Sequence, residues 1–398
     1  MVDKLSEITR SDPVSLPTSH GVGANNIDRF LAQCRPETPC LVIDLDIVRA
    51  QYHALRAVFP NARIFYAVKA NPAAEVIAAL AELGCNFDLA SAGEIHRCQA
   101  LGIGAERLSF GNTIKREAEV TDAHARGIDL FAFDSIAELE KLSRAAPGAR
   151  VYCRLLVGGR RAEWPLSRKF GCAPDMAIDL LLHARTLRLR PVGVSFHIGS
   201  QQTDPQQWSP AVADAARVFR ACARSGLDLD LLNVGGGFPA HYRTPVPSIA
   251  AYAEAIDSAL AAHFRAARPP LLVEPGRHLV GHAGILRSQV LLIARKAHDA
   301  ARRWVYIDAG RYNGLPETSG ERIHYRFRTP HDGGACEDAI LAGPTCDSTD
   351  VIYQYADCRL ALDLAIGDPL DFLSAGAYTA SYASVEFNGF PPLRTYCI

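Results

Sequence analysis

Short apolar runs alternate with longer amphipathic stretches over most of the first 280 residues. Eight runs rich in β-branched and aromatic residues predict strands: Arg63–Val68, Cys85–Ala90, Arg107–Gly111, Ile128–Phe133, Arg150–Leu156, Val192–His197, Leu229–Val234 and Leu271–Glu274. The stretches between them have helical spacing, clearest in Pro72–Leu83, Asp175–Leu189 and Ser248–Phe264. Eight such units in about 230 residues match a closed (β/α)₈ barrel of the TIM type. The competing architecture, an open doubly wound sheet, more often carries a glycine-rich turn after its first strand, which is absent here.

Helical spacing largely ends near residue 282, and the chain beyond it reads as strands and turns. The predicted strands there are Ile285–Ala294, Arg303–Asp308, Arg322–Thr329, Val351–Ala356 and Pro369–Leu373. We therefore predict a barrel over residues 38–282 and a second, antiparallel β domain over residues 283–398. The apolar run at residues 38–46 is predicted to add a strand to that domain. Residues 1–37 are assigned to an N-terminal arm, polar and loose up to about residue 25.

Composition and charge narrow the class of protein. The 398 residues are 48% hydrophobic and 21% charged, as expected for a globular chain with a full core. Lys and Arg total 42 and Asp and Glu total 43, so the formal net charge of −1 argues against a basic field that would hold nucleic acid or a membrane surface. No apolar run is long enough for a transmembrane helix, and no signal peptide is evident. The 11 cysteines form no C-x-x-C pair, so we expect free thiols in a reducing, cytoplasmic compartment and no bound metal.

Barrel active sites lie at the C-terminal ends of the strands. Six of the eight predicted ends carry an ionisable side chain or a glycine cluster, namely Lys69, Asp88, Arg154, His197, Gly235–Gly237 and Glu274. Ionisable side chains are rarely buried unless they are paired or functional. Taken alone, Lys69 could still extend to solvent, His197 could be a hydrogen-bonded core residue, and the glycines could form an ordinary loop.

The residue types at these ends suggest a cofactor. The apolar approach Ile64–Val68 predicts a desolvated Lys69 amine with a lowered pKa, suited to bonding a carbonyl carbon. Gly235–Gly237 follows strand seven, where barrels commonly bind phosphate, and Arg277 could add charge-assisted hydrogen bonds. A lysine, a phosphate cradle and a carboxylate facing one another suggest pyridoxal 5′-phosphate. Glu274 would keep the pyridine nitrogen protonated, so that the ring can accept the electron pair left when a bond to Cα breaks.

Longer motifs surround these groups in a fixed order. They are Tyr66-Ala-Val-Lys-Ala-Asn71, Phe87-Asp-Leu-Ala-Ser91, Ser167-Arg-Lys-Phe-Gly171, Phe196-His-Ile-Gly-Ser200, Asn233-Val-Gly-Gly-Gly-Phe238, Glu274-Pro-Gly-Arg277, Gly343-Pro-Thr-Cys-Asp-Ser-Thr-Asp350, and Gly376-Ala-Tyr378 with Phe387-Asn-Gly-Phe390. With them the chain resembles the fold-type III pyridoxal-phosphate-dependent decarboxylases, the ornithine and diaminopimelate decarboxylase group, over about residues 38–392. The resemblance implies an alanine-racemase-like barrel with a C-terminal β domain.

The resemblance also implies a role for each matching residue. Lys69 would hold the cofactor's aldehyde, His197 would stack on the ring, and Glu274 would pair with the ring nitrogen. The residues expected to hold the phosphate or line its site are Ser200, Gly235, Gly236, Gly237, Gly276, Arg277 and Tyr378. Asp88 and Arg154 would lie beside the lysine–cofactor bond.

A second set of implied roles belongs to the C-terminal part. Cys346 would return a proton to Cα in the partner subunit's site after carbon dioxide leaves. Asp347 would reach the substrate's distal amine there, with Tyr312 as a further substrate contact. This arrangement implies a head-to-tail homodimer with two shared sites. Without its Asp347 and Asp350 neighbours, Cys346 would be read as a structural cysteine.

The substrate is predicted from a dipeptide. Cys346-Asp347 resembles the ornithine/lysine branch, whereas the diaminopimelate branch usually has Cys-Glu there. We therefore expect L-ornithine or L-lysine to be converted to the diamine and carbon dioxide, as in polyamine biosynthesis. A second acid near the distal amine is expected; Glu317 and Glu321 are candidates, and either could instead be a solvated loop charge.

Other readings stay open. Arg322 and Arg326 allow a conjugated substrate, such as a siderophore or antibiotic intermediate, and meso-diaminopimelate is a further alternative. An amino-acid racemase shares the lysine-bearing barrel but typically faces the ring nitrogen with arginine, so Glu274 opposes that reading. A regulatory protein without catalysis would be expected to have lost Lys69, Cys346 or the phosphate glycines, and all are present.

Overall fold

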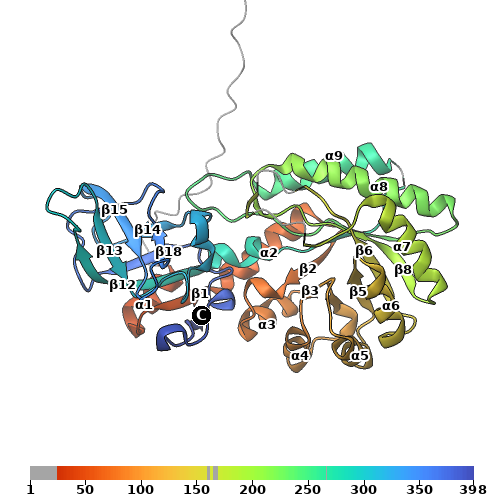
Figure 1. The fold of residues 1–398 in the computed structure, drawn as a ribbon, viewed down its shortest axis with the longest axis horizontal. Coiled ribbons are helices and arrows are strands. Elements are labelled where there is room, and N and C mark those ends of the chain that lie inside the picture. Colours follow the sequence, from red (N-terminus) through yellow and green to blue (C-terminus); the bar gives the residue numbers. More distant parts are fainter. Residues whose placement is uncertain (1–24, 159–161, 165–168, 266) are drawn as a thin grey trace, which may run out of the picture.

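The fold comes from a computed structural model that describes residues 25–158, 162–164, 169–265 and 267–398. A barrel and a β-sheet part lie side by side along the long axis of the molecule (Figure 1). The polar arm predicted up to about residue 25 lies almost wholly outside the described residues, as do Ser167 and Arg168 of one sequence motif.

Eight parallel strands close into the barrel in the order β10-β11-β2-β3-β4-β5-β6-β8. Their bounds are β2 (Arg63–Ala67), β3 (Asn86–Leu89), β4 (Leu108–Phe110), β5 (Leu130–Phe133), β6 (Arg150–Arg154), β8 (Arg190–Ser195), β10 (Leu231–Asn233) and β11 (Leu271–Val273). Each strand overlaps one of the eight predicted runs, so the closed barrel is confirmed. A small antiparallel ribbon, β7 (Ala162–Trp164) with β9 (Ser200–Gln202), lies outside this ring.

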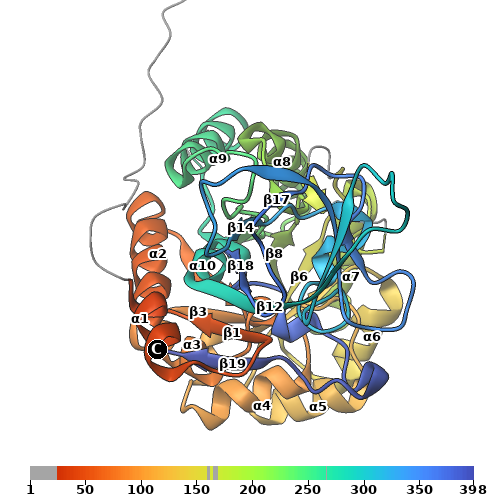
Figure 2. The same ribbon diagram turned by 90° about the vertical axis from the view of Figure 1, so that its left-hand side faces the viewer.

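Helices surround the barrel strands (Figures 1 and 2). They are α2 (Leu45–Val58), α3 (Ala74–Glu82), α4 (Ala92–Ala100), α5 (Glu117–Ala125), α6 (Ile136–Ala145), α7 (Pro174–Thr186), α8 (Trp208–Arg224), α9 (Ile249–Phe264) and the short α10 (Arg277–Val280). Several begin at a side chain that accepts a backbone N–H, as Ser91, Ser135 and Ser248 do for α4, α6 and α9. Among the described residues no helix is both long and apolar enough to cross a membrane.

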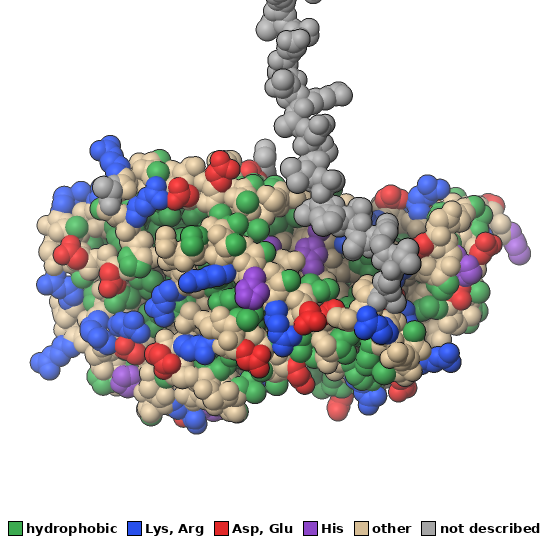
Figure 3. Space-filling view, turned by 180° about the vertical axis from the view of Figure 1, so that it is seen from behind, with side chains coloured by type: hydrophobic (Ala, Val, Ile, Leu, Met, Phe, Trp, Pro, Cys, Tyr) green, Lys and Arg blue, Asp and Glu red, His purple; other side chains and the backbone are tan. Residues whose placement is uncertain are grey.

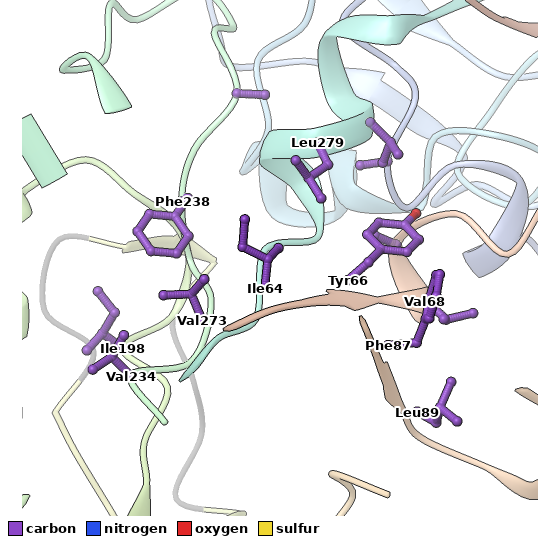
Figure 4. Packing of buried hydrophobic residues seen from close by; sticks show 14 of the residues in the cluster. Ile64, Tyr66, Val68, Phe87, Leu89, Ile198, Val234, Phe238, Val273 and Leu279 are labelled. Carbon is purple, nitrogen blue, oxygen red and sulfur yellow. The ribbon is translucent and has the colours of Figure 1, made fainter. Parts of the chain in front are cut away.

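The period-two alternation of a strand separates two apolar layers. On β2, Ile64 and Tyr66, followed by Val68, point outward into the main core with Phe87 and Leu89 of β3 (Figure 4). Residues of opposite parity point into the barrel, where Phe65 packs in a separate cluster with Leu130, Ala132, Tyr152, Leu231 and Leu272. This alternation decides which strand-end side chains reach the interior.

The C-terminal part is one nine-stranded sheet. Its strands are β1 (Cys40–Ile43), β12 (Gly284–Ala294), β13 (Arg303–Ile307), β14 (Arg326–Arg328), β15 (Cys336–Ala342), β16 (Val351–Tyr353), β17 (Arg359–Ala361), β18 (Pro369–Leu373) and β19 (Arg394–Cys397). The expectation of a purely antiparallel domain needs correction, because β13 pairs with β15, and β1 with β19, in parallel. The sheet is therefore mixed.

Two further expectations are corrected. The predicted strand Arg322–Thr329 shortens to β14, and β15, β17 and β19 were not predicted. Residues 25–37, assigned to the N-terminal arm, contain helix α1 (Asn26–Cys34), whose Ile27 and Leu31 pack on β1 and β12.

On the face opposite to that of Figure 1, basic and acidic side chains are interspersed, in line with the near-zero net charge (Figure 3).

Candidate active site

The mouth of the barrel gathers side chains from the carboxyl ends of its strands. On β2 the inward parity of Phe65 and Ala67 continues to Lys69 in the turn Val68–Ala70, and on β3 it selects Asp88. The cavity at this end is lined by Ala67, Lys69, His197, Ser200, Gly237, Phe238, Glu274, Gly276, Arg277 and Tyr378. Eight of these ten were expected from the sequence.

Lys69 and Asp88 face each other, with 3.9 Å between Lys69 Nζ and Asp88 Oδ2. Desolvation by itself lowers the pKa of Lys69, but the negative charge of Asp88 and those of Tyr378 and Glu274 raise it above its ordinary value. The predicted lowered pKa of Lys69 is therefore wrong for the cofactor-free site, because the approach to the amine is apolar while the far side of the mouth is acidic. Burial raises the pKa of Asp88, opposed by Lys69 and Arg154.

Glycine is required at the predicted phosphate cradle. Gly235 and Gly237 have φ of +68° and +105°. A Cβ on Gly235 would lie 2.1 Å from the Phe196 carbonyl oxygen, and one on Gly236 would lie 2.2 Å from that of Glu274. The backbone here approaches its neighbours more closely than any side chain allows, which leaves main-chain groups to face an anion.

Glu274 follows β11, and Asn233, at the end of β10, donates from Nδ2 to Glu274 Oε1. The same Asn233 accepts the Gly235 N–H at 2.9 Å, so one buried amide holds both the carboxylate and the first cradle glycine. Burial, helped by the charge of Asp88, raises the pKa of Glu274 to about 7. Sequence reasoning missed this role of Asn233, although the residue opens the Asn233–Phe238 motif.

His197 and Arg154 complete the predicted cofactor set. His197 Nδ1 accepts the Gly199 N–H at 3.1 Å. Burial holds the pKa of His197 well below its ordinary value, with Arg154 and Lys69 adding to the shift, so the imidazole is neutral near pH 7. The Arg154 guanidinium lies 5.0 Å from the centre of the Phe170 ring.

Arg277 is buried at the same end of the barrel, in an ion pair that the sequence did not predict. Its Nη2 donates to Glu317 Oε1 at 2.6 Å and its Nη1 to Glu317 Oε2 at 2.7 Å. Its guanidinium also lies 5.0 Å from the Tyr378 ring. Glu317 is thus neither a solvated loop charge nor free to meet a substrate amine. Glu321 accepts the backbone N–H groups of Gln354 and Ala356, so it too is engaged within the C-terminal part.

The loop with Cys346 and Asp347 is not brought to this cavity within one chain. Cys346 is exposed, and its N–H donates to Asn388 Oδ1 at 2.9 Å. Asp347 accepts the Thr349 N–H at 2.8 Å, and the Tyr312 hydroxyl lies 2.8 Å from Thr349 Oγ1. The loop is held by Asp350, whose buried carboxylate accepts the N–H groups of Thr345 and Arg311.

The residues present fit pyridoxal phosphate. Gly237 brings its backbone to the cavity, Lys69 offers an amine, and Glu274 offers a carboxylate for a ring nitrogen. Asp88 Oδ1 is buried without a hydrogen-bond partner in the described structure, an acceptor left over in this otherwise well-paired mouth. This constellation can hold the cofactor and polarise its ring.

Comparisons with known proteins agree with this geometry. A family model described as "Pyridoxal-dependent decarboxylase, pyridoxal binding domain" matches residues 45–281. A lysine/ornithine decarboxylase of Selenomonas ruminantium is 33% identical over 89% of this chain and 88% of its own length. An antizyme inhibitor 2 of Xenopus laevis is 32% identical over 90% of this chain and 80% of its own. A solved lysine/ornithine decarboxylase of Vibrio vulnificus, complexed with cadaverine, superposes with a TM-score of 0.83 at 32% identity, covering 94% of this chain and 97% of that one.

The family model spans more than half of the chain, and the relatives align along most of its length. The relatives also carry different names, so this likeness gives the family and the cofactor but leaves the substrate undecided. The chain belongs to the fold-type III decarboxylases of the ornithine, lysine and arginine decarboxylase family, and its cofactor is pyridoxal 5′-phosphate.

Proposed function

We propose that the protein is an amino-acid decarboxylase acting on L-ornithine, L-lysine or both, releasing carbon dioxide and the diamine. The observation that supports the reaction is Glu274, a carboxylate that Asn233 holds at the cavity in the barrel mouth. Bound pyridoxal phosphate supplies an electron sink for the pair left on Cα when the carboxylate departs. Relatives named lysine/ornithine decarboxylase support the substrate class.

The chain's own residues divide the remaining work. Lys69 would bind the cofactor's aldehyde carbon, neutral His197 would lie against the ring, and Glu274 would hold a proton on the ring nitrogen. Cys346 of a second subunit delivers a proton to Cα. Asp347 of that subunit pairs with the distal ammonium of the substrate, and Tyr312 lies beside it.

A homodimer is part of this proposal. Next to the Cys346 loop, the segment from Ala380 to Asn388 exposes Tyr382, Val385 and Phe387, and Val385 is 72% exposed. Phe387 packs on Tyr312 with ring centres 4.5 Å apart, while Ser381 Oγ donates to the Lys69 carbonyl at 2.9 Å. An apolar strip between the Lys69 turn and the Cys346 loop is a surface that a second copy would cover.

The compartment is a further part of the proposal, and the thiols support it. All eleven cysteines lie in described parts of the chain and all are free. We propose the reducing cytoplasm as the compartment, where thiols stay free.

Two experiments test the proposal. Product mass spectrometry on the cofactor-loaded protein should show loss of carbon dioxide from L-ornithine or L-lysine, in a panel with their D-forms, L-arginine and meso-diaminopimelate. Turnover of none of them would contradict the proposed substrate class and redirect the search to conjugated amino acids.

Shared sites are tested by subunit mixing. Lys69→Ala and Cys346→Ala homodimers should each be nearly inactive, and their mixture should recover about a quarter of wild-type activity, since half of the dimers are then hybrids with one intact site. A mixture as inactive as its parents would refute the shared site.

A further inference from the structure

The ion pair between Arg277 and Glu317 reaches the phosphate site from the C-terminal part of the chain. Glu317 lies in the 3₁₀ segment η5 (Pro316–Glu321), after β13, and Arg277 begins α10 beside the glycine cradle. Only 2% of the Arg277 side chain and 4% of the Glu317 side chain are exposed. A buried bidentate pair in this position is a strong orienting contact, because removal of one partner leaves a buried charge.

The guanidinium of Arg277 has five N–H groups, and each has an acceptor in the protein. Besides its two bonds to Glu317, Nη1 donates to the Tyr242 hydroxyl at 2.7 Å. The last two N–H groups go to Ser200 Oγ, from Nη2 at 3.1 Å and from Nε at 3.4 Å. Arg277 is therefore directed at Ser200.

Ser200 lies at the cradle itself. Ser200 lines the same cavity as Gly237. The preceding residue, Gly199, contacts Gly237 closely, since a Cβ on Gly237 would lie 2.4 Å from the Gly199 carbonyl oxygen. A serine oxygen accepts two hydrogen bonds and donates one. With Arg277 supplying both accepted bonds, the hydroxyl hydrogen of Ser200 is left to donate into the cavity.

We propose that Glu317 is a positioning residue for the cofactor phosphate: it holds Arg277, and Arg277 turns the Ser200 hydroxyl toward the glycine cradle. The inference concerns cofactor affinity and goes beyond the proposed function, since it is independent of which amino acid is decarboxylated.

The test is a double-mutant cycle on the dissociation constant of pyridoxal phosphate, followed by titration of the cofactor's visible absorbance. Glu317→Gln and Ser200→Ala should each raise the Kd about tenfold, the loss of about one charge-assisted hydrogen bond. The double variant should show about the same tenfold rise instead of a hundredfold one, because both changes remove one interaction. At saturating cofactor, the KM for L-lysine and L-ornithine should change by less than about twofold.

A matched control is available on the same segment. Glu321→Gln removes an equal charge but leaves Arg277 untouched, so the Kd should stay at the wild-type value. Should Glu317→Gln fail to fold, as judged by circular dichroism, Glu317→Asp replaces it: the charge remains but the shorter side chain loses the bidentate geometry, and the Kd should again rise in a manner that is non-additive with Ser200→Ala.

Three outcomes would overturn the inference. Tighter cofactor binding in Glu317→Gln would mean that the carboxylate acts only by repelling the phosphate. An unchanged Kd with a raised KM for lysine and ornithine would make Glu317 a reader of the distal amine. Additive effects in the cycle would mean that Glu317 does not act through Ser200.

Discussion

The ionised side chain of Glu274 should destabilise the cofactor-free protein, although the same side chain is needed for decarboxylation. The variant Glu274→Gln tests both effects. Burial and the charge of Asp88 raise the pKa of Glu274 from 4.5 to about 7. Between these two values the folded protein binds a proton that the unfolded chain has lost, so the contribution of Glu274 to stability falls as pH rises. Above pH 7 the protein has lost about 3 kcal/mol of unfolding free energy through Glu274. About 2 to 3 kcal/mol of this is lost between pH 5 and pH 8.

The assay is thermal unfolding of cofactor-free wild type and Glu274→Gln at both pH values. Glutamine keeps the shape of the side chain and cannot ionise. The Tm of the variant minus the Tm of wild type should therefore be about 3 °C larger at pH 8 than at pH 5. Turnover of the loaded enzyme should fall about a hundredfold or more, because an amide does not hold the ring nitrogen's proton.

Glu321 provides a control of opposite sign. Partial burial raises the pKa of Glu321, but the hydrogen bonds that its carboxylate accepts from backbone N–H groups lower it by more. The pKa therefore lies below its ordinary value. Its carboxylate therefore stabilises the fold above about pH 4.5, and Glu321→Gln should lower Tm at pH 8. If Glu274→Gln had the same effect on Tm at pH 5 and pH 8, the burial argument would be wrong, and unchanged turnover would remove the electron-sink role.

Three further changes probe the mouth of the barrel. Lys69→Ala should keep the fold and abolish the visible absorbance of lysine-bound cofactor in a spectrophotometric titration; persistence of that absorbance would exclude Lys69 as the attachment point. Gly236→Ala would place a Cβ 2.2 Å from the Glu274 carbonyl oxygen, so equilibrium dialysis should show a Kd for pyridoxal phosphate raised by at least about tenfold. Asn233→Ala removes the donor to Glu274 and the acceptor of the Gly235 N–H, and calorimetry should show a loss of about 2 to 3 kcal/mol.

The barrel could be predicted because its strands obey a local rule. Alternation along β2, β3 and β6 puts every second residue inside, and the residue types at the strand ends then identify the cofactor site. The mixed sheet was harder, because β17 and β19 have only three and four residues, and β15 opens with Cys336-Glu-Asp338 rather than an apolar run. The parallel pairing of β15 with β13 depends on the path of the chain between the two strands. The local sequence pattern does not specify that path.

The same limit explains the chemistry that was missed. The pKa of Lys69 was misjudged because the preceding apolar residues are local, whereas the charges that raise it come from three other segments of the chain. The partner of Arg277 was missed because Glu317 is 40 residues away and approaches from the other domain.

If Glu317 positions the phosphate groups as proposed, the cofactor site depends on how the sheet part docks onto the barrel. Segment η5 sends Glu317 inward to Arg277, while the following strands carry the Cys346 loop outward. Removing the Glu317 carboxylate alone, with the sheet in place, would leave the Arg277 charge buried without its partner, at a cost of about 3 to 5 kcal/mol. The buried Arg277 of the barrel is thus paired by a carboxylate from the sheet part, and this pairing accounts for the burial of a charged Glu317 beside Thr318.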